Sequence, residues 1–272
     1  VGAKVKSFDA AQTLKVPGVE KVVQLEGSMP PAKFAPLGGI AVIATNTGAA
    51  IKGREALKIE WGNSPHAAYD SVAFRKQMEE TARKPGKVVR TSGDVDGALA
   101  SAAKVVAAEY YIPHHAHAPM EPPAAAARVA DGACEVWAAV QSPYGTREDL
   151  AKTLGLPIEK VTVHVALLGG GFGRKSKCDY ALEAALLSKE LGGTPVKVMW
   201  TREDDIQNSF YHTVSVERIE AGLDAGGKVT AWRHRSVAPT IFSTFMPDPK
   251  YQHPLELAMG FVDMPFDIAN VR

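Results

Sequence analysis

Apolar residues recur along the chain at two spacings, which predict strands interleaved with helices. Short apolar or alternating runs predict strands at residues 19–25, 39–44, 57–61, 104–112, 124–129, 134–141, 161–168 and 195–200. Helical spacing predicts helices at 47–57 with Thr47 as the cap, at 71–81, from Asp94 or Asp96 to Ala103, at 143–154 and at 179–189. Two alternating stretches, 211–223 and 229–237, flank the turn at 224–227 and predict a long hairpin.

This order of elements predicts an α+β fold with mixed sheets and packed helices. Residues 1–61 form a small α/β unit, and residues 62–86, polar and broken by prolines, form a connection. Residues 87–272 form the second unit. Beyond Ala238, five prolines predict irregular loops rather than regular elements.

Composition excludes several classes of protein. The 272 residues carry 31 basic and 30 acidic side chains, without a basic stripe, which argues against nucleic-acid binding. No apolar run approaches the ~20 residues of a membrane span. Cys134 and Cys178 lie 44 positions apart, so the chain cannot ligate an iron–sulfur cluster alone, and two free thiols are favoured over a disulfide.

The most informative stretch is the glycine-rich segment Gly169–Lys175, which reads Gly-Gly-Gly-Phe-Gly-Arg-Lys. It lies between a predicted strand and a predicted helix. Four glycines in five positions permit positive φ and let a ligand approach the backbone. Such a loop before a helix directs several N–H groups toward one point, which favours an anion or a polarised oxygen. Arg174 and Lys175 add positive charge beside that point.

Two common nucleotide motifs do not fit this segment. Counted from Gly169, Arg174 stands where a Walker A loop needs its second glycine. The dinucleotide pattern fails as well, because its last glycine falls on Arg174 or Ser176. ATP and NAD are both disfavoured, and a tight glycine turn that only lets a helix pack on a strand remains the alternative.

Several other polar residues could carry chemistry. His114, His115 and His117 precede Glu121, but this spacing does not set three imidazoles on one face, so we expect a cleft-lining loop rather than a protein-ligated metal. Gln141, at the end of an apolar strand, either caps the next helix or donates from its amide to an oxygen near the glycine loop. Ser176, Ser209 and Ser243 do not stand in the Gly-x-Ser-x-Gly motif of serine hydrolases. The acidic run at 202–205 indicates a solvated turn after a strand, or acids that cap a following helix.

The order of these pieces resembles the molybdenum-binding subunit of the xanthine dehydrogenase/aldehyde oxidase family. The matching stretches cover nearly the whole chain: residues 16–19 and 46–61, which resemble the family's hammerhead-like domain, then 117–122, 136–141, 169–175, 183–189 and 195–205. The resemblance implies that residues 1–61 are part of a hammerhead-like domain and residues 87–272 the N-terminal part of the molybdenum-cofactor-binding domain. Arg174-Lys175 most resembles the isoquinoline 1-oxidoreductase β-subunit branch. Ser176 stands where the xanthine enzymes have a purine-binding glutamate, which argues against xanthine as substrate.

The resemblance implies roles for particular residues. Gln141 would hydrogen-bond the apical oxo ligand of molybdenum. The backbone of Gly170, Gly171, Phe172, Gly173 and Arg174 would hold the pterin dithiolene and metal-oxo end of the cofactor. Pterin sulfurs ligate the metal in the family, so no protein metal ligand is expected, and in bacterial relatives the cofactor is molybdopterin cytosine dinucleotide.

The family's catalytic base is a glutamate that we expect beyond Arg272, in a longer chain. We therefore expect residues 1–272 alone to be inactive and to hold the cofactor poorly. The full-length protein would hydroxylate an N-heteroaromatic carbon with water as the oxygen source, and electrons would leave through iron–sulfur clusters on a small partner subunit.

Three alternatives remain open at this stage. The first is an aldehyde-oxidising member of the same family, and the second is a non-catalytic scaffold that keeps the fold. The third is a nucleotide-phosphate binder that uses Lys175. The sequence begins at Val1 without a signal-like region, so a periplasmic and a cytoplasmic location both stay open, as do the substrate, the electron acceptor and the oligomeric state.

Overall fold

The computed structural model describes residues 2–29 and 31–272, which divide into two compact units. Of these described residues, unit 1 combines 2–29 and 31–68 with 116–210, and unit 2 combines 69–115 with 211–272. Each unit is thus built from two separate stretches of chain. The predicted domain boundaries, after residues 61 and 86, stay predictions.

The strands of unit 1 form one four-stranded sheet and two smaller ribbons. The four-stranded sheet has the order β8-β7-β6-β9, with parallel β7–β8 and antiparallel β6–β7 and β6–β9 pairs, so it is mixed. The strands of unit 1 are β1 (Val5–Asp9), β2 (Val19–Leu25), β3 (Gly39–Ala44), β4 (Lys58–Trp61), β6 (Ala124–Ala130), β7 (Ala133–Ala138), β8 (Val161–Val165) and β9 (Val196–Met199).

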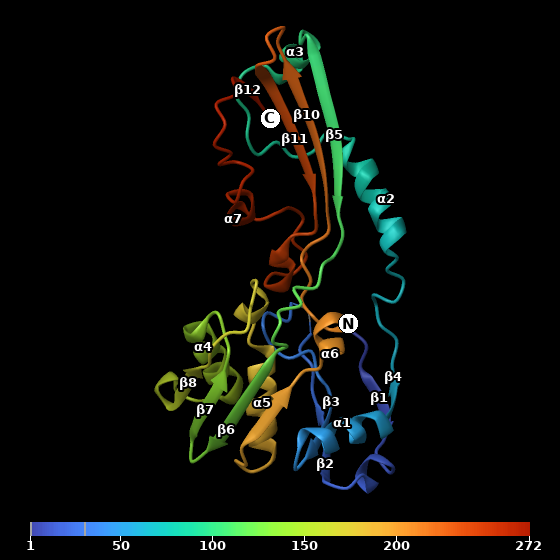
Figure 1. The fold of residues 1–272 in the computed structure, drawn as a ribbon, viewed down its shortest axis with the longest axis vertical. Helices are drawn as coiled ribbons and strands as arrows, with labels where there is room; N and C mark the ends of the chain where they lie inside the picture. Colours follow the sequence, from blue (N-terminus) through green and yellow to red (C-terminus); the bar gives the residue numbers. More distant parts are fainter. Residues whose placement is uncertain (1, 30) are drawn as a thin grey trace. The chain divides into compact units, whose positions relative to one another are not determined.

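Helices cover this sheet and fix the ends of its strands. Helix α5 lies against it (Figure 1), and the small buried side chains Ala181, Ala184 and Ala185 let the helix approach the alanine-rich strand β6 closely. The helices of unit 1 are α1 (Thr47–Ala56), α4 (Pro143–Leu154), α5 (Asp179–Glu190) and α6 (Arg202–Gln207), with 3₁₀ turns η1 (Thr13–Lys15), η2 (Ile158–Lys160) and η3 (Arg174–Ser176).

Unit 2 contains a second mixed sheet, of order β12-β11-β10-β5. The predicted hairpin is confirmed as β10–β11, with antiparallel pairing. Its elements are α2 (Ser71–Ala82), α3 (Val95–Ala100), β5 (Lys104–Ile112), β10 (Ser215–Leu223), β11 (Val229–Val237), η4 (Ile241–Thr244), α7 (Pro254–Leu257) and β12 (Asn270–Val271). The α+β class with mixed sheets and packed helices is confirmed.

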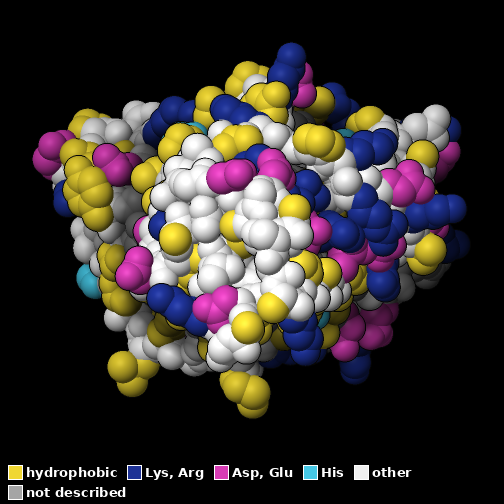
Figure 2. Space-filling view, turned by 90° about the horizontal axis from the view of Figure 1, so that it is seen from above, with side chains coloured by type: hydrophobic (Ala, Val, Ile, Leu, Met, Phe, Trp, Pro, Cys, Tyr) yellow, Lys and Arg dark blue, Asp and Glu magenta, His cyan; other side chains and the backbone are white. Residues whose placement is uncertain are grey.

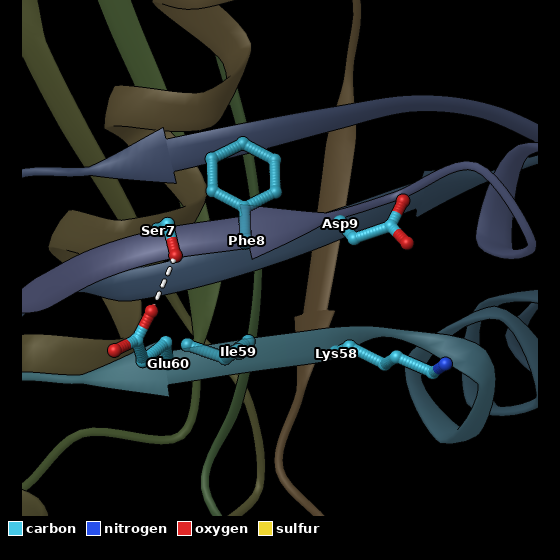
Figure 3. Close-up of a pocket in the computed structure, with 6 residues that line it drawn as sticks. All are labelled: Ser7, Phe8, Asp9, Lys58, Ile59 and Glu60. Atoms are coloured by element: carbon cyan, nitrogen blue, oxygen red, sulfur yellow. Dashed lines mark hydrogen bonds between the residues drawn. The ribbon is translucent and has the colours of Figure 1, made fainter.

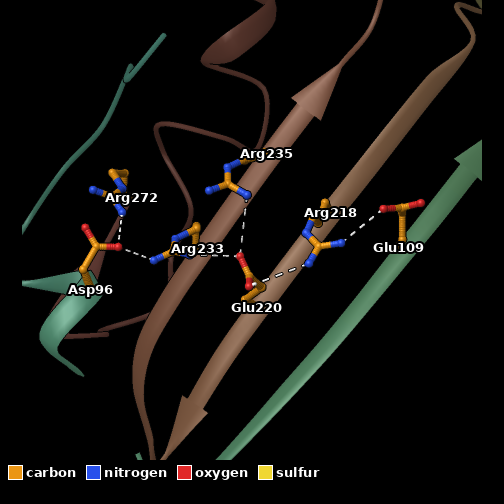
Figure 4. A network of polar contacts seen from close by, with 7 residues as sticks. All are labelled: Asp96, Glu109, Arg218, Glu220, Arg233, Arg235 and Arg272. Carbon is orange, nitrogen blue, oxygen red and sulfur yellow. Dashed lines mark hydrogen bonds and ion pairs between the residues drawn. The ribbon is translucent and has the colours of Figure 1, made fainter. Parts of the chain in front are cut away.

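Alternating charges run across the sheet of unit 2 (Figure 4). Arg218 lies 3.4 Å from Glu109, and Arg233 lies 3.2 Å from Glu220. Asp96 at helix α3 accepts from Arg233 and from Arg272, the latter at 2.6 Å. Opposite charges facing across neighbouring strands favour this register of the sheet.

Four local predictions are wrong. Asn46, not Thr47, caps α1, because its side chain accepts from the Ala49 N–H at 2.9 Å. The segment beyond Ala238 is not free of regular elements, because Thr240 caps η4 and His253 caps α7, whose first position tolerates Pro254. The acidic run is not a solvated turn. It forms α6, which Thr201 and Asp204 close with a capping box, as the alternative interpretation proposed.

The fourth wrong prediction concerns the strands next to the glycine-rich segment. Strand β7 ends at Ala138 rather than at Gln141, and β8 ends at Val165 rather than at Leu168. Pro143 opens helix α4, so the chain turns away from the sheet before residue 141. Once β7 leaves, β8 has no partner with which to continue its ladder of hydrogen bonds.

Surface charges of both signs are interspersed on the face drawn in Figure 2. This pattern agrees with the near-zero net charge of the sequence. In the part of the chain that the structure describes, no helix has the length and apolar character needed to cross a bilayer.

Candidate functional site

The glycine loop, defined here as residues Gly169–Gly173, follows strand β8 in unit 1. Gly170 and Gly173 adopt left-handed φ values of +94° and +92°, which favour glycine. Phe172 also has a positive φ, +52°, and its side chain is 73% exposed. Turn η3 separates the loop from α5, so the loop does not run directly into the helix as expected.

Glu121 holds the first end of the loop. Its backbone N–H donates to the Gly169 carbonyl at 3.0 Å, and its Oε2 accepts from the Gly169 N–H at 3.2 Å. The same carboxylate oxygen accepts from the Lys175 ammonium. The segment 119–121 therefore lies along the start of the loop, 48 or more residues away in sequence.

Gln141 holds the other end of the loop. Its Oε1 accepts from the Gly173 N–H at 3.0 Å, and its backbone N–H donates to the Lys175 carbonyl at 2.9 Å. Because Oε1 faces a donor, the amide orientation is fixed and Nε2 keeps its two N–H groups. Among the described residues, Nε2 has no hydrogen-bond partner, and the residue is exposed. Residue 141 therefore lies beside the glycine loop, and its role toward a cofactor stays a prediction.

Three consecutive amides between these two ends have no acceptor. The N–H groups of Gly170, Gly171 and Phe172 donate to no group in residues 2–29 and 31–272. By contrast, the Gly173 N–H donates to Gln141, and the Arg174 N–H donates to the Gly171 carbonyl at 2.9 Å. Adjacent main-chain donors in a loop with positive φ form a recess suited to anions and polarised oxygens.

The space beside the loop is too narrow for a side chain at one position. A Cβ at Gly171 would lie 2.3 Å from Gln141 Oε1, closer than real contacts allow. Glycine at this position therefore lets the Gln141 amide lie directly over the loop backbone.

The side chains of Arg174 and Lys175 differ from the prediction. Neither offers an unpaired charge beside a ligand, because both are buried, at 0% and 1% exposure, in ion pairs. Arg174 makes two parallel hydrogen bonds of 2.9 Å to Asp179 and stacks near Trp200 and Phe210. Residues outside the glycine segment supply the counter-charges, and the sequence pattern did not reveal them.

Burial shifts the pKa values of acids on helix α5. Burial raises the pKa of Asp179, and the ion pair with Arg174 opposes this rise. Burial and the nearby Asp179 raise the pKa of Glu183 to about 7, while the hydrogen bond from the Trp200 indole, at 2.9 Å, acts in the opposite direction. These acids support the packing behind η3 and do not belong to the loop.

The other predicted polar residues lie elsewhere. His114 and His115, in unit 2, associate with the His212 backbone, through His114 Nδ1 at 3.1 Å and a β-bridge, respectively. His117 belongs to unit 1. Within the described ranges, no three His, Cys, Asp or Glu side chains are arranged to hold a metal ion. Cys134 and Cys178 are buried free thiols, as predicted.

A hollow on the β1–β4 ribbon of unit 1 shares no lining residue with the glycine loop (Figure 3). Its lining residues are Ser7, Phe8, Asp9, Lys58, Ile59 and Glu60. It includes none of the residues that contact the loop, so we attach no function to it.

The ion pair between Glu121 and Lys175 was not predicted from the sequence. Glu121 stands in the Met-Glu-Pro stretch that carried part of the resemblance, but its pairing with a lysine 54 positions away has no local signature. Three-dimensional structure was needed to connect the two.

Comparison with known proteins identifies the family. Residues 79–272 match the molybdopterin cofactor-binding domain family over most of the chain. The chain therefore belongs to this family, whose members include molybdenum-binding subunits of the xanthine dehydrogenase/aldehyde oxidase group. The resemblance stated from the sequence is confirmed.

Individual relatives extend this result. The chain is 34% identical over 239 residues to a membrane-bound aldehyde dehydrogenase [pyrroloquinoline-quinone] of Gluconacetobacter polyoxogenes, with 87% of this chain and 30% of the relative covered. It is 28% identical to the isoquinoline 1-oxidoreductase subunit beta of Brevundimonas diminuta, over 90% of this chain and 31% of the relative. The chain thus spans about a third of the length of these relatives.

A solved structure shares the fold. The aldehyde oxidoreductase of Desulfovibrio gigas superimposes with a TM-score of 0.73 at 20% identity, over 99% of this chain and 33% of the other. At this identity the likeness shows the fold alone.

Proposed function

We propose that this chain forms one wall of the molybdenum-cofactor site of a molybdenum hydroxylase, within a longer protein. The observation that carries the proposal is the row of amides at Gly170, Gly171 and Phe172, which have no acceptor among the described residues. Gly171 is buried beneath the Gln141 side chain, whose Nε2 likewise has no partner in that part of the chain, while Phe172 is exposed. Family membership makes a molybdopterin group the ligand to consider. Activity, substrate and partners belong to the full-length protein.

The chain's donors fit such a group. A molybdopterin cofactor presents oxygen atoms at its metal end and on its phosphates. The loop offers the N–H groups of Gly170, Gly171 and Phe172, and no carboxylate among the described residues accepts from them. In the proposed site, Gly170, Gly171 and Phe172 donate directly through the backbone. Gly173 and Arg174 take part by closing the loop, since their own N–H groups are already bonded.

The bound cofactor would supply two-electron oxidation of a carbon centre with water as the oxygen source. The chain's own contribution is to bind and orient. Gln141 Nε2 would donate toward the metal end, while Gln141 Oε1 keeps the amide aligned through its bond to Gly173. The cytosine dinucleotide form, and electron transfer through a small iron–sulfur subunit, are parts of the proposal that the family resemblance supports.

An N-heteroaromatic substrate is our first proposal. The Arg174-Lys175 pair resembles the isoquinoline branch, and an isoquinoline 1-oxidoreductase subunit is among the relatives. Ser176, which replaces the purine-binding glutamate of the xanthine enzymes, argues against xanthine.

Aldehyde oxidation is the second candidate, and a specific observation favours it. The relative at 34% identity is named an aldehyde dehydrogenase, whereas the isoquinoline relative shares 28%. The name of the former also carries pyrroloquinoline quinone, so the cofactor must be identified chemically in the experiment.

The test uses the full-length protein with its partner subunit. Molybdenum and pterin per protein are measured by mass spectrometry for the wild type, for Gln141→Ala and for the matched control Gln77→Ala, an exposed glutamine on α2. We expect molybdenum in the wild type and the control and several-fold less in Gln141→Ala. Turnover of isoquinoline against aldehydes then separates the two substrate classes. A wild type that holds a quinone or no cofactor contradicts the proposal, and the latter result favours a scaffold.

A further inference from the structure

Lys175 is a buried cation that connects both holders of the glycine loop. Its side chain is 0% exposed, yet it carries a charged ammonium group whose acceptor is Glu121 Oε2. Its carbonyl accepts from the Gln141 N–H at 2.9 Å. One residue is therefore bonded to the groups that hold the loop at Gly169 and at Gly173.

Glu121 differs from Lys175 in its access to water. Its side chain is 41% exposed, so water solvates part of the carboxylate. Water does not reach the Lys175 side chain, and a fully buried ammonium without a partner is costly. Burial therefore makes the ion pair more important for Lys175 than for Glu121. Because the buried ammonium is stabilised only where the carboxylate contacts it, the pair holds the Glu121 carboxylate in one position.

The fixed carboxylate in turn occupies the Gly169 amide. Glu121 Oε2 accepts from the Gly169 N–H at 3.2 Å, while the next three N–H groups have no acceptor in the described chain. The carboxylate thereby defines where the row of open donors begins, and Gln141 Oε1 defines where it ends.

A purely stabilising function explains this arrangement poorly. Buried ion pairs contribute little net stability, and apolar side chains of similar volume often serve as well or better. Their best-attested benefit is to fix one geometry among several.

We propose that Glu121 and Lys175 are positioning residues, which hold the glycine loop so that the amides of Gly170, Gly171 and Phe172 stay free to bind the cofactor. This inference rests on the proposed function for its ligand. The order that the pair imposes on the loop is a property of the protein without cofactor and is measurable on its own.

The experiment compares variants of the full-length protein. Glu121→Ala removes the acceptor, and Lys175→Met removes the ammonium while it keeps the chain length. Glu121→Gln keeps an oxygen for both donors but removes the negative charge that faces the buried ammonium, so it is the intermediate variant. Lys6→Met and Glu60→Ala, from an exposed ion pair of unit 1 with side chains 66% and 56% exposed, are the matched controls.

The first measurement is hydrogen exchange, on protein made without molybdate, resolved at the hydrogen-bonded amides of Gly169, Gly173 and Arg174. Glu121→Ala and Lys175→Met should exchange at least about tenfold faster than the wild type there, while Glu121→Gln shows a smaller increase and the controls stay within about threefold. The second measurement is molybdenum per protein after prolonged dialysis, which should fall by about tenfold in the same two variants only. Unfolding temperatures identify any variant that has lost its fold.

The outcomes are distinct. Unchanged exchange and unchanged molybdenum in both Glu121→Ala and Lys175→Met overturn the positioning proposal. If these variants do not fold, Glu121→Asp replaces them, because its carboxylate is one methylene shorter and is drawn back from Lys175 and Gly169. Wild-type exchange and wild-type metal content in Glu121→Asp also overturn the positioning proposal. A wild type without molybdenum sinks the proposed function instead, while the exchange result still reports on the loop.

Discussion

Replacing Gly171 by alanine tests most sharply how the loop and residue 141 fit together. The added Cβ would lie 2.3 Å from Gln141 Oε1 and 2.6 Å from its Cδ. Normal contacts for these atoms begin near 3.4 Å, so the Gln141 amide has to retreat by roughly 1 Å. The 3.0 Å bond from the Gly173 N–H then exceeds hydrogen-bonding range.

The cost follows from these displacements. The lost hydrogen bond contributes about 0.5–1.5 kcal/mol, at the low end here because water reaches both exposed groups. An off-rotamer Gln141 side chain adds about 0.5–1.5 kcal/mol. The variant should therefore fold, with a loss on the order of 1–3 kcal/mol, while the Nε2 donor leaves its place beside the open amides.

The assay is molybdenum per protein in the full-length enzyme after dialysis, together with the unfolding temperature. We expect about tenfold less metal for Gly171→Ala, since each 1.4 kcal/mol of binding corresponds to about tenfold. Gly86→Ala is the control, because a Cβ there meets nothing within 4 Å. Wild-type metal content in Gly171→Ala, at an unfolding temperature equal to that of Gly86→Ala, would refute the reasoning.

Three further predictions concern the scaffold behind the loop, and unfolding measurements check each of them. Arg174→Met should destabilise the protein by about 3–5 kcal/mol, because Asp179 is left buried without its partner; a loss below about 1 kcal/mol would contradict the buried pair. Gly155→Ala should cost about 1–2 kcal/mol, since φ is +70° at this helix end although space is free, and a neutral result would contradict this. For Glu183, the pKa of about 7 exceeds the ordinary 4.5, so the folded state retains a proton that the unfolded state loses and stability falls as pH rises between these values. Glu183→Gln should therefore gain stability relative to the wild type from pH 5 to pH 8, and a pH-independent difference would disprove the shift.

Local patterns sufficed to predict much of the fold. Helix α4 spans Pro143–Leu154, as the helical spacing of apolar residues predicted, and strand β5 has its predicted bounds. The strand ends at Ala138 and Val165 were missed, because they depend on where a neighbouring strand stops. Such information is not local to either segment.

The candidate site was also predictable only where local sequence carries the information. Glycines at 169–173 indicate a bare backbone by themselves, and Gln141 stood out as a polar residue after an apolar run. The ion pairs of Arg174 and Lys175 were not predictable, because an arginine or lysine in a sequence looks the same whether it is solvated or buried. Their partners at 179 and 121 become evident only when the chain is folded.

The most direct test of the account is an experimental structure of the molybdenum-loaded, full-length protein. We expect oxygen atoms of the cofactor within hydrogen-bonding distance of Gln141 Nε2 and of at least one N–H among Gly170, Gly171 and Phe172. A cofactor bound away from this loop, or a loop whose three amides are all bonded to other parts of the protein, would contradict it.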